Sequence, residues 1–291
     1  MLLTRRTFLQ LVGASVAATT LRPLTGLAAA VDADTYWGRA FTVVPVYATP
    51  DAGKSAVRQL WPDSMVSIVD QTDNWYRLEN GWVRRVDIQP MLPYKVDEYV
   101  FQAQTPFWAE VAAPVASVRA YCSADAPLIT RVGHGGVMQV IDALPGEPNG
   151  WYGVADENGV LLGWSQGVFW RPVTVDNGSS EGRMLRFDRQ TFLMSAFDHN
   201  DLILQVPFSS REALEAGQYQ VRRGAIGGGS LSGYAAVPWT MKFGQHQAIA
   251  GAYWHNQFGH TVSQGSAIQL TPVLARWVYG WLGDNGHIMI E

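Results

Sequence analysis

An internal repeat in the first two thirds of the chain limits the possible folds more than any other feature. Residues 44–91 and 116–173 both read as a short strand, a turn of small residues, an apolar run, a Trp-Tyr pair and a Gly-Trp pair. Alternating apolar residues rich in β-branched side chains predict strands, and a repeat of roughly 55 residues fits a small five-stranded barrel. The sequence therefore predicts two consecutive all-β modules.

The two repeats resemble the Src-homology-3-like modules of bacterial wall-associated proteins, and we place them at residues 38–92 and 108–173. In that family an aromatic groove often binds the peptide stems of peptidoglycan, or the module serves only as a spacer. Aromatic side chains dominate the cores of small barrels, so we expect the tryptophans of the repeated pairs to pack in the core and at its rim. These residues are Trp75, Trp82, Trp151 and Trp164.

Residues 1–30 have the features of a twin-arginine export signal. Arg5 and Arg6 stand before an apolar stretch at 8–21, and a run of small residues ends at Ala30. This arrangement is typical of a cleaved signal that carries folded proteins out of a prokaryotic cytoplasm. A retained membrane anchor is the alternative, although the stretch is short for a span and contains polar residues. We predict a secreted, extracytoplasmic, cell-wall-associated protein with no transmembrane segment after cleavage.

The composition argues against several classes of partner. The formal net charge is −4, and it becomes more negative if the signal is removed with its arginines. An acidic chain argues against nucleic acid or anionic lipid as the partner. The only cysteine, Cys122, can form no internal disulfide, so core burial must stabilise the exported chain. A lone cysteine inside a β repeat is typical of a small buried apolar residue.

Residues 183–291 are predicted to form a third domain, mostly β with one clear helix. Thr271 offers an N-cap with Pro272 at the first helical position, and the helix should stop near Gly283. Apolar runs predict strands at 192–197, 202–206, 217–223, 234–243, 248–255 and 287–290. The whole chain is thus expected to be mainly β, with two small barrels followed by a β-sandwich that carries the helix.

The stretch YWHNQFGHTVSQGSAIQLTPVLARWVYGW at 253–281 gives this third domain a resemblance to a known family. With the strand before it, it is similar to the catalytic domain of L,D-transpeptidases, and the resemblance covers about residues 185–290. That family carries a His-Gly at the end of a strand and a Ser-His-Gly-Cys motif before the helix. Its Cys attacks the tetrapeptide stem of peptidoglycan beside the terminal D-alanine. The two His activate the thiol and order the site, and the acyl group passes to an amine of a neighbouring stem.

The reactive positions of this chain depart from the family pattern. The family's first His corresponds to Ala250. Counting forward from YWHN, the motif's His, Gly and Cys fall on Gln264, Gly265 and Ser266. Counting backward from the helix, the nucleophile position falls on Ala267 and the His position on Gly265. Both registers stay open, and under either one no thiol and no imidazole remains at these positions.

Without these groups the family's mechanism is lost. The pKa of a Cys thiol can be lowered until thiolate forms at neutral pH, whereas a Ser hydroxyl needs an adjacent base. General-base help is worth roughly 10²–10⁴-fold in rate, and neither Ala250 nor Gln264 can supply it. The candidates for a displaced base beside Ser266 are His246, His255 and His260. The alternatives are a structural or substrate-ordering role for His255 and simple solvation for His260.

The sequence predicts no catalytic residue, no metal site and no cofactor. The histidines near the motif lack the converging acids or cysteines of zinc sites, and the glycine-rich run at 224–233 lacks the Lys of a phosphate loop. A retained groove could still bind a peptide stem, unless its aromatic residues merely pack the sheet. The residues expected to line this groove are Trp239, Tyr253, Trp254, His255 and Asn256.

Three functions stay open from the sequence. The first is a pseudoenzyme: an exported, inactive L,D-transpeptidase-like protein that binds peptidoglycan stems or a cell-wall enzyme. The second is an active acyl transferase or peptidase that uses Ser266 as nucleophile and a displaced His as base. The third is a structural adaptor with no affinity for peptidoglycan, because a fold can persist while its function changes.

Overall fold

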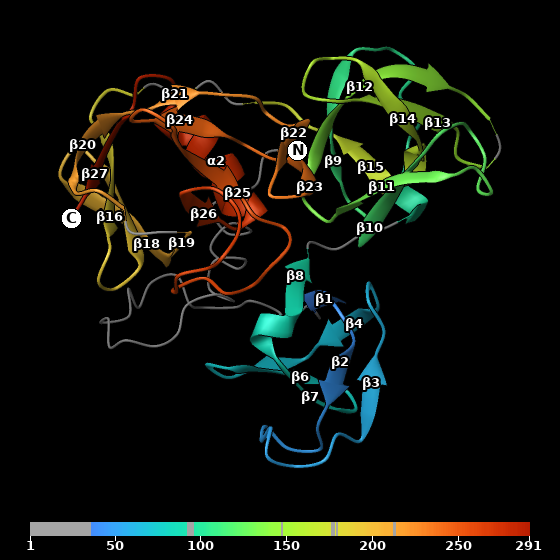
Figure 1. Ribbon diagram of the computed structural model, residues 1–291, viewed down its shortest axis with the longest axis horizontal. Helices are drawn as coiled ribbons and strands as arrows, with labels where there is room; N and C mark the ends of the chain where they lie inside the picture. Colours follow the sequence, from blue (N-terminus) through green and yellow to red (C-terminus); the bar gives the residue numbers. More distant parts are fainter. Residues whose placement is uncertain (1–35, 92–95, 147, 176–177, 179, 212–213) are drawn as a thin grey trace. The chain divides into compact units, whose positions relative to one another are not determined.

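The computed structural model describes residues 36–91, 96–146, 148–175, 178, 180–211 and 214–291 (Figure 1). The predicted export signal at 1–30 lies outside these residues. The chain divides into two compact units, Met1–Pro93 and Tyr94–Glu291, and each is described by itself. In the described part of the chain, no helix combines the length and the hydropathy that a membrane span needs.

Three small antiparallel sheets form the first unit, with strand orders β4-β1-β8, β2-β3 and β5-β6-β7. The stretch 65–71 contributes a strand to two of these sheets, because it is interrupted at Val69. Before Val69, β4 pairs with β1, and after it β5 pairs with β6. The strands are β1 Tyr36–Ala40, β2 Val44–Val46, β3 Arg58–Leu60, β4 Met65–Ile68, β5 Asp70–Gln71, β6 Trp75–Leu78, β7 Gly81–Arg84 and β8 Ile88–Met91, with a 3-10 helix at Arg85–Asp87.

Period-two burial accounts for the strands of this unit. In β4, Val66 and Ile68 are buried while Met65 is exposed, and in β6 the side chains of Tyr76 and Leu78 alternate with outward residues. Side chains on alternate positions of a strand point to opposite faces, so these strands each present one apolar face. The buried faces meet in a single cluster with Ala40, Val44, Val46, Leu60, Val83 and Ile88.

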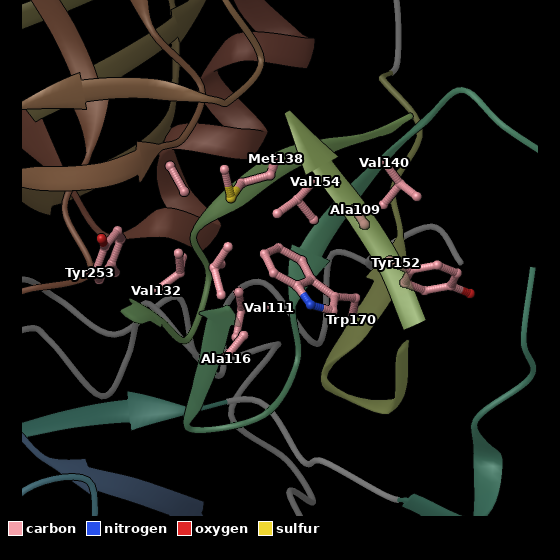
Figure 2. Close-up of a cluster of buried hydrophobic side chains, with 12 residues drawn as sticks. Ala109, Val111, Ala116, Val132, Met138, Val140, Tyr152, Val154, Trp170 and Tyr253 are labelled. Atoms are coloured by element: carbon pink, nitrogen blue, oxygen red, sulfur yellow. The ribbon is translucent and has the colours of Figure 1, made fainter. Parts of the chain in front are cut away.

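The second unit begins with a seven-stranded antiparallel sheet in the order β11-β10-β14-β13-β12-β9-β15. Its core contains Trp170, whose indole N–H donates to the hydroxyl of Ser165 at 2.9 Å. Figure 2 shows this ring among the valines of neighbouring strands, and Tyr253 reaches the same cluster from the C-terminal part. The strands are β9 Phe107–Val111, β10 Val115–Arg119, β11 Leu128–Gly133, β12 Val137–Leu144, β13 Trp151–Ala155, β14 Leu161–Gln166 and β15 Trp170–Pro172, with 3-10 helices at Val96–Glu98 and Gly167–Phe169.

The repeated sequence pairs occupy matching places in the two units. The Trp-Tyr pairs open β6 and β13, where Tyr76 and Tyr152 are buried. The tryptophans of the repeated pairs are all half-buried, as expected of residues at the rim of a core: Trp75, Trp82, Trp151 and Trp164. The tryptophans thus border the core, as expected for the rim, whereas the core positions belong to the tyrosines that follow them, which the sequence analysis did not predict.

Two five-stranded sheets and one α-helix make up the rest of the second unit. The orders are β18-β17-β16-β27-β20 and β19-β26-β25-β24-β21, and β22 and β23 form a separate hairpin. The helix α2 packs against β25, β26 and β16. The elements are β16 Arg183–Asp188, β17 Leu193–Asp198, β18 Asp201–Pro207, β19 Ser209–Ser210, β20 Gly217–Gln220, β21 Arg222–Arg223, β22 Gly229–Leu231, β23 Tyr234–Val237, β24 Met241–Phe243, β25 Gln247–Gly251, β26 Ile268–Leu270, α2 Pro272–Leu282 and β27 His287–Ile290.

The predicted fold class, mainly β with one clear helix, is confirmed for the described residues. Closed five-stranded barrels are not seen among them, because every sheet ends in edge strands. The break at Val69 divides the first repeat between sheets, and in the second repeat the strand register shifts at Val118, Val140 and Val154. Such irregularities bend strands and increase their twist. The assignment of the repeats to Src-homology-3-like modules stays a prediction.

Candidate functional site

The strand, loop and helix of the transpeptidase-like motif come together around β25 and β26. These two strands are parallel neighbours, and their register places Ala250 beside Gln269. The loop 252–267 leaves β25, crosses to β26, and continues through Thr271 into α2. Thr271 caps the helix, since its hydroxyl accepts a hydrogen bond from the Leu274 N–H at 3.3 Å. The predicted capped start of the helix is confirmed.

The side-chain amide of Gln269 is buried against the motif loop. Gln269 is 0% exposed, and its side-chain N–H groups donate to the carbonyls of Gln264 at 2.7 Å and Ser266 at 3.2 Å. Gly265 lies directly against it with φ +106°, and a Cβ at this glycine would come within 2.3 Å of the amide oxygen. Only glycine suits this conformation and this approach. The loop and the amide therefore form one tightly packed unit.

His255 is held in one tautomer by the same network. The Gln257 backbone N–H donates to its Nδ1 at 3.1 Å, so the ring proton lies on Nε2 and is donated to the Gln269 oxygen at 3.0 Å. Burial lowers the pKa of His255, and the hydrogen bond to Gln269 opposes that shift. The imidazole is therefore neutral at neutral pH, and both of its nitrogens are engaged.

Neither candidate nucleophile position is open to solvent. Ser266 is 5% exposed, and its hydroxyl donates to the carbonyl of Ile268 at 2.7 Å. Ala267, the position given by the other register, is also buried. His260 is exposed on the loop. Within the described chain, no hydrogen bond joins a histidine ring to the Ser266 hydroxyl.

The aromatic residues predicted to line a groove separate into two settings. Trp254 is half-buried and stacks on Tyr234, with ring centroids 4.5 Å apart and planes inclined by 8°. Tyr253 is buried, and its hydroxyl donates to the carbonyl of Ala235 at 2.6 Å. Trp239 instead lies in the interior, with the Arg276 guanidinium 5.5 Å from its ring centroid. Tyr253 and Trp254 thus adjoin His255, whereas Trp239 belongs to the packing around α2.

Asn256 follows His255 on the loop and is half-buried. Trp254, two residues before Asn256, has a buried indole N–H with no hydrogen-bond partner, and Trp239 has one as well. Unpaired buried donors are rare in folded proteins and often mark strained or functional positions. In the described chain, few other side chains have a buried polar atom without a hydrogen-bond partner.

A hairpin formed by β22 and β23 borders the motif, and it begins within the glycine-rich run at 224–233. Its turn includes Ser232, whose hydroxyl oxygen accepts from the Gly265 N–H at 3.2 Å. Ser232, Ala236 and Trp239 all have positive φ, between 52° and 59°. For residues other than glycine such backbone is strained, and strain of this kind clusters at functional sites. The glycine-rich run was the available signal, because glycines permit close approach.

The seven-stranded sheet is joined to the motif's helix through a buried carboxylate. Glu110 on β9 is 1% exposed and pairs with Arg171 at 3.1 Å and with Arg276 of α2 at 3.3 Å. His134 lies nearby, fully buried. Burial, reinforced by the charge of Arg171, lowers its pKa to about 4 against the opposing effect of Glu110. This cluster ties the second repeat to the helix that follows the motif.

No metal centre is formed by the described residues: nowhere do three or more His, Cys, Asp or Glu side chains converge. The residues that sequence analysis missed here are Gln269, Ser232, Tyr234 and Glu110.

No protein-family model and no curated protein matches the chain. Among solved structures, an L,D-transpeptidase from Mycobacterium smegmatis is 16% identical, with a TM-score of 0.32, over 38% of this chain and 58% of that one. An L,D-transpeptidase from Xylanimonas cellulosilytica is 11% identical, with a TM-score of 0.27, over 42% and 64%. One from Mycobacterium tuberculosis H37Rv is 14% identical, with a TM-score of 0.33, over 69% and 96%. The chain spans less than two thirds of the first two structures. At these TM-scores the likenesses assign no function.

Proposed function

We propose that this chain is an exported, cell-wall-associated L,D-transpeptidase-like protein that has lost catalysis and binds peptidoglycan peptide stems or a cell-wall enzyme. The sequence resemblance at 185–290, the two preceding repeats and the twin-arginine pattern support this assignment. One observation carries the loss of catalysis: at the motif, the hydroxyl of Ser266 is buried and donates to a backbone carbonyl.

The hydrogen bonds of His255, which Gln269 links to the motif, support the same conclusion. A serine nucleophile requires a base within roughly 2.6–3.2 Å that can accept its proton. His255 cannot serve while its Nδ1 accepts from Gln257 and its Nε2–H is donated to Gln269. Activation of Ser266 would require breaking two contacts: its own hydrogen bond to Ile268 and the one that the Gln257 N–H makes to Nδ1 of His255.

The surroundings of the motif support a binding role for this region and not a catalytic one. Trp254 and Tyr234 form a stacked pair beside His255, and the strained hairpin 229–237 closes one side of the loop. Aromatic surfaces with a few fixed polar groups are typical of recognition sites. A peptide stem, or a segment of a wall enzyme, would contact these residues without meeting a nucleophile.

The test is to incubate the purified protein with disaccharide-tetrapeptide muropeptides and to follow their masses. We expect unchanged muropeptides, beside an active L,D-transpeptidase that processes them. Release of D-alanine or a cross-linked dimer, abolished by Ser266→Ala, would overturn the proposal.

Binding is measured in the same preparation by co-sedimentation with purified sacculi. Wild-type protein and Ser266→Ala should sediment equally, because the proposal gives the hydroxyl no role. If neither sediments with sacculi and neither is captured by a cell-wall enzyme, the adaptor function is correct instead.

A further inference from the structure

A groove in the first unit lies apart from the motif and is not used by the proposed function. Its walls come from β3, the turn that follows it, β4, and the turn between β6 and β7, and its volume is about 380 Å³. Ligand pockets commonly span roughly 300–1,000 Å³, so this groove is large enough for a small ligand. Buried Leu60, Val66 and Leu78 form its floor.

The most unusual residue of this groove is Trp61. Its side chain is 70% exposed, the highest exposure of any tryptophan in the described chain. No aromatic ring or cation covers it within the part of the chain that the structure describes. Tryptophan carries a large apolar surface that normally stabilises a protein only when it is buried. A ring left open beside a groove is suited to contact a ligand.

The polar residues around Trp61 offer a balanced set of donors and acceptors. Arg58 and Glu79 contribute opposite charges, and Gln59 and Asn80 contribute amides, all on the exposed rim. Hydroxyl groups of Ser64 and Ser67 lie further in, and both are half-buried. Planar amide, carboxylate and guanidinium groups can each bind two neighbouring hydroxyls at once. The balance of charge favours a neutral ligand over an anionic one.

We propose that this groove binds a neutral oligosaccharide, with the apolar face of one sugar ring stacked on Trp61. The equatorial hydroxyls of such a ring both donate and accept hydrogen bonds, which matches the mixed rim. An anionic polymer would meet Glu79 and the net negative charge of the chain. An extended peptide is the competing class. It would pair with the edge strands β3 and β4 through backbone hydrogen bonds, whereas the open Trp61 ring and the mixed polar side chains favour the sugar.

The experiment is a titration of the full chain with tri-N-acetylchitotriose and with cellotriose, followed by NMR of the tryptophan indole N–H signals. We expect saturable shifts of the Trp61 signal with at least one trisaccharide. Trp61→Ala should raise the Kd at least tenfold, which corresponds to about 1.4 kcal/mol. Trp61 is exposed, so this variant should keep the fold, and the dispersion of its spectrum verifies that it does. The matched control is Tyr121→Ala, an exposed aromatic of the second unit, which should leave the Kd unchanged.

Three results would overturn the proposal. They are the absence of a saturable shift with either trisaccharide, equal affinity in Trp61→Ala, and Trp61-dependent binding of a blocked tetra-alanine peptide without binding of sugar. The inference is independent of the muropeptide test, because the groove lies in the first unit and the motif in the second. If the muropeptide test contradicts the proposed function, the sugar-binding proposal is unaffected, and the reverse also holds.

Discussion

At the scale of single residues, Gln269 determines what the transpeptidase-like motif can do. Its amide binds the imidazole of His255 on one side and the carbonyls of Gln264 and Ser266 on the other. It therefore holds the base candidate and the nucleophile's own backbone in a fixed arrangement. The amide thus links the loop, the imidazole and β26 through three hydrogen bonds.

Replacing Gln269 with Leu should destabilise the second unit by about 2–4 kcal/mol, because three hydrogen bonds would be lost together and the Ser266 carbonyl would stay buried without its partner. The free energy of unfolding is measured by urea denaturation. Gln205→Leu is the control, since this half-buried amide donates one hydrogen bond to Ser195 and should cost less than about 1 kcal/mol. Equal costs for the two variants would mean that the Gln269 network contributes nothing particular.

The sequence indicated His255, Ser266 and the missing His at Ala250, but not Gln269. Motif reasoning compares residue types at expected positions, and Gln269 lies outside the four motif positions, within an apolar strand. Its importance comes from the parallel pairing of β25 with β26, which brings it beside Ala250. Strand pairing between segments separated in sequence is not visible in either segment alone.

At the scale of elements, the junction between the second repeat and α2 is built around a buried carboxylate. Glu110 on β9 pairs with Arg276 on α2 and with Arg171 on β15. His134 packs beside them, and its Nδ1 donates to the carbonyls of Ala112, at 3.0 Å, and Ala113, at 3.3 Å. Buried ion pairs hold elements in one arrangement, because breaking one leaves an uncompensated charge.

His134 should make the second unit sensitive to acid. Its pKa is about 4 in the folded chain and about 6.5 when unfolded, so the unfolded state binds its proton first. Its contribution is complete above about pH 6.5 and declines by about 3 kcal/mol as the pH falls towards 4. His134→Asn keeps a donor for the two carbonyls and removes the titration. The stability of this variant should therefore fall less between pH 7 and pH 4.

The measurement is the free energy of unfolding against pH, with His199→Asn as the control. His199 is exposed, so this variant controls for the loss of a histidine outside the buried cluster. Parallel profiles for wild type and His134→Asn would show that another group causes the acid sensitivity.

Local sequence patterns predicted an element with correct bounds where the helical or strand pattern was uninterrupted. The helix cap at Thr271 and the last strand at 287–290 follow directly from their sequences. The strand expected at 234–243 is instead split by Pro238 and Trp239, and the one expected at 248–255 ends at Gly251. At Trp239 the chain turns into the packing around α2, and after Gly251 it enters the motif loop, so tertiary contacts override the apolar pattern in both cases.

At the scale of the molecule, the second repeat and the C-terminal part share a core. Tyr253 and Ala236 belong to the same buried cluster as Val132, Met138 and Trp170 (Figure 2). The sequence predicted separate domains at 108–173 and 183–291, with a polar linker between them. Residues 94–291 form one compact unit, and side chains from both parts meet in this cluster.

A shared core predicts that the second unit opens cooperatively. Tyr253→Ala should remove a buried ring and the hydrogen bond to Ala235, at a cost of about 3 kcal/mol or more. Hydrogen exchange should then accelerate together in β11, β12 and β25, since cooperative units lose protection as a whole. Peptides from β1 to β8 should exchange as in the wild type, and Tyr121→Ala should change neither set. Faster exchange confined to β25 and its loop would mean that the second repeat and the C-terminal part unfold separately, as the sequence first suggested.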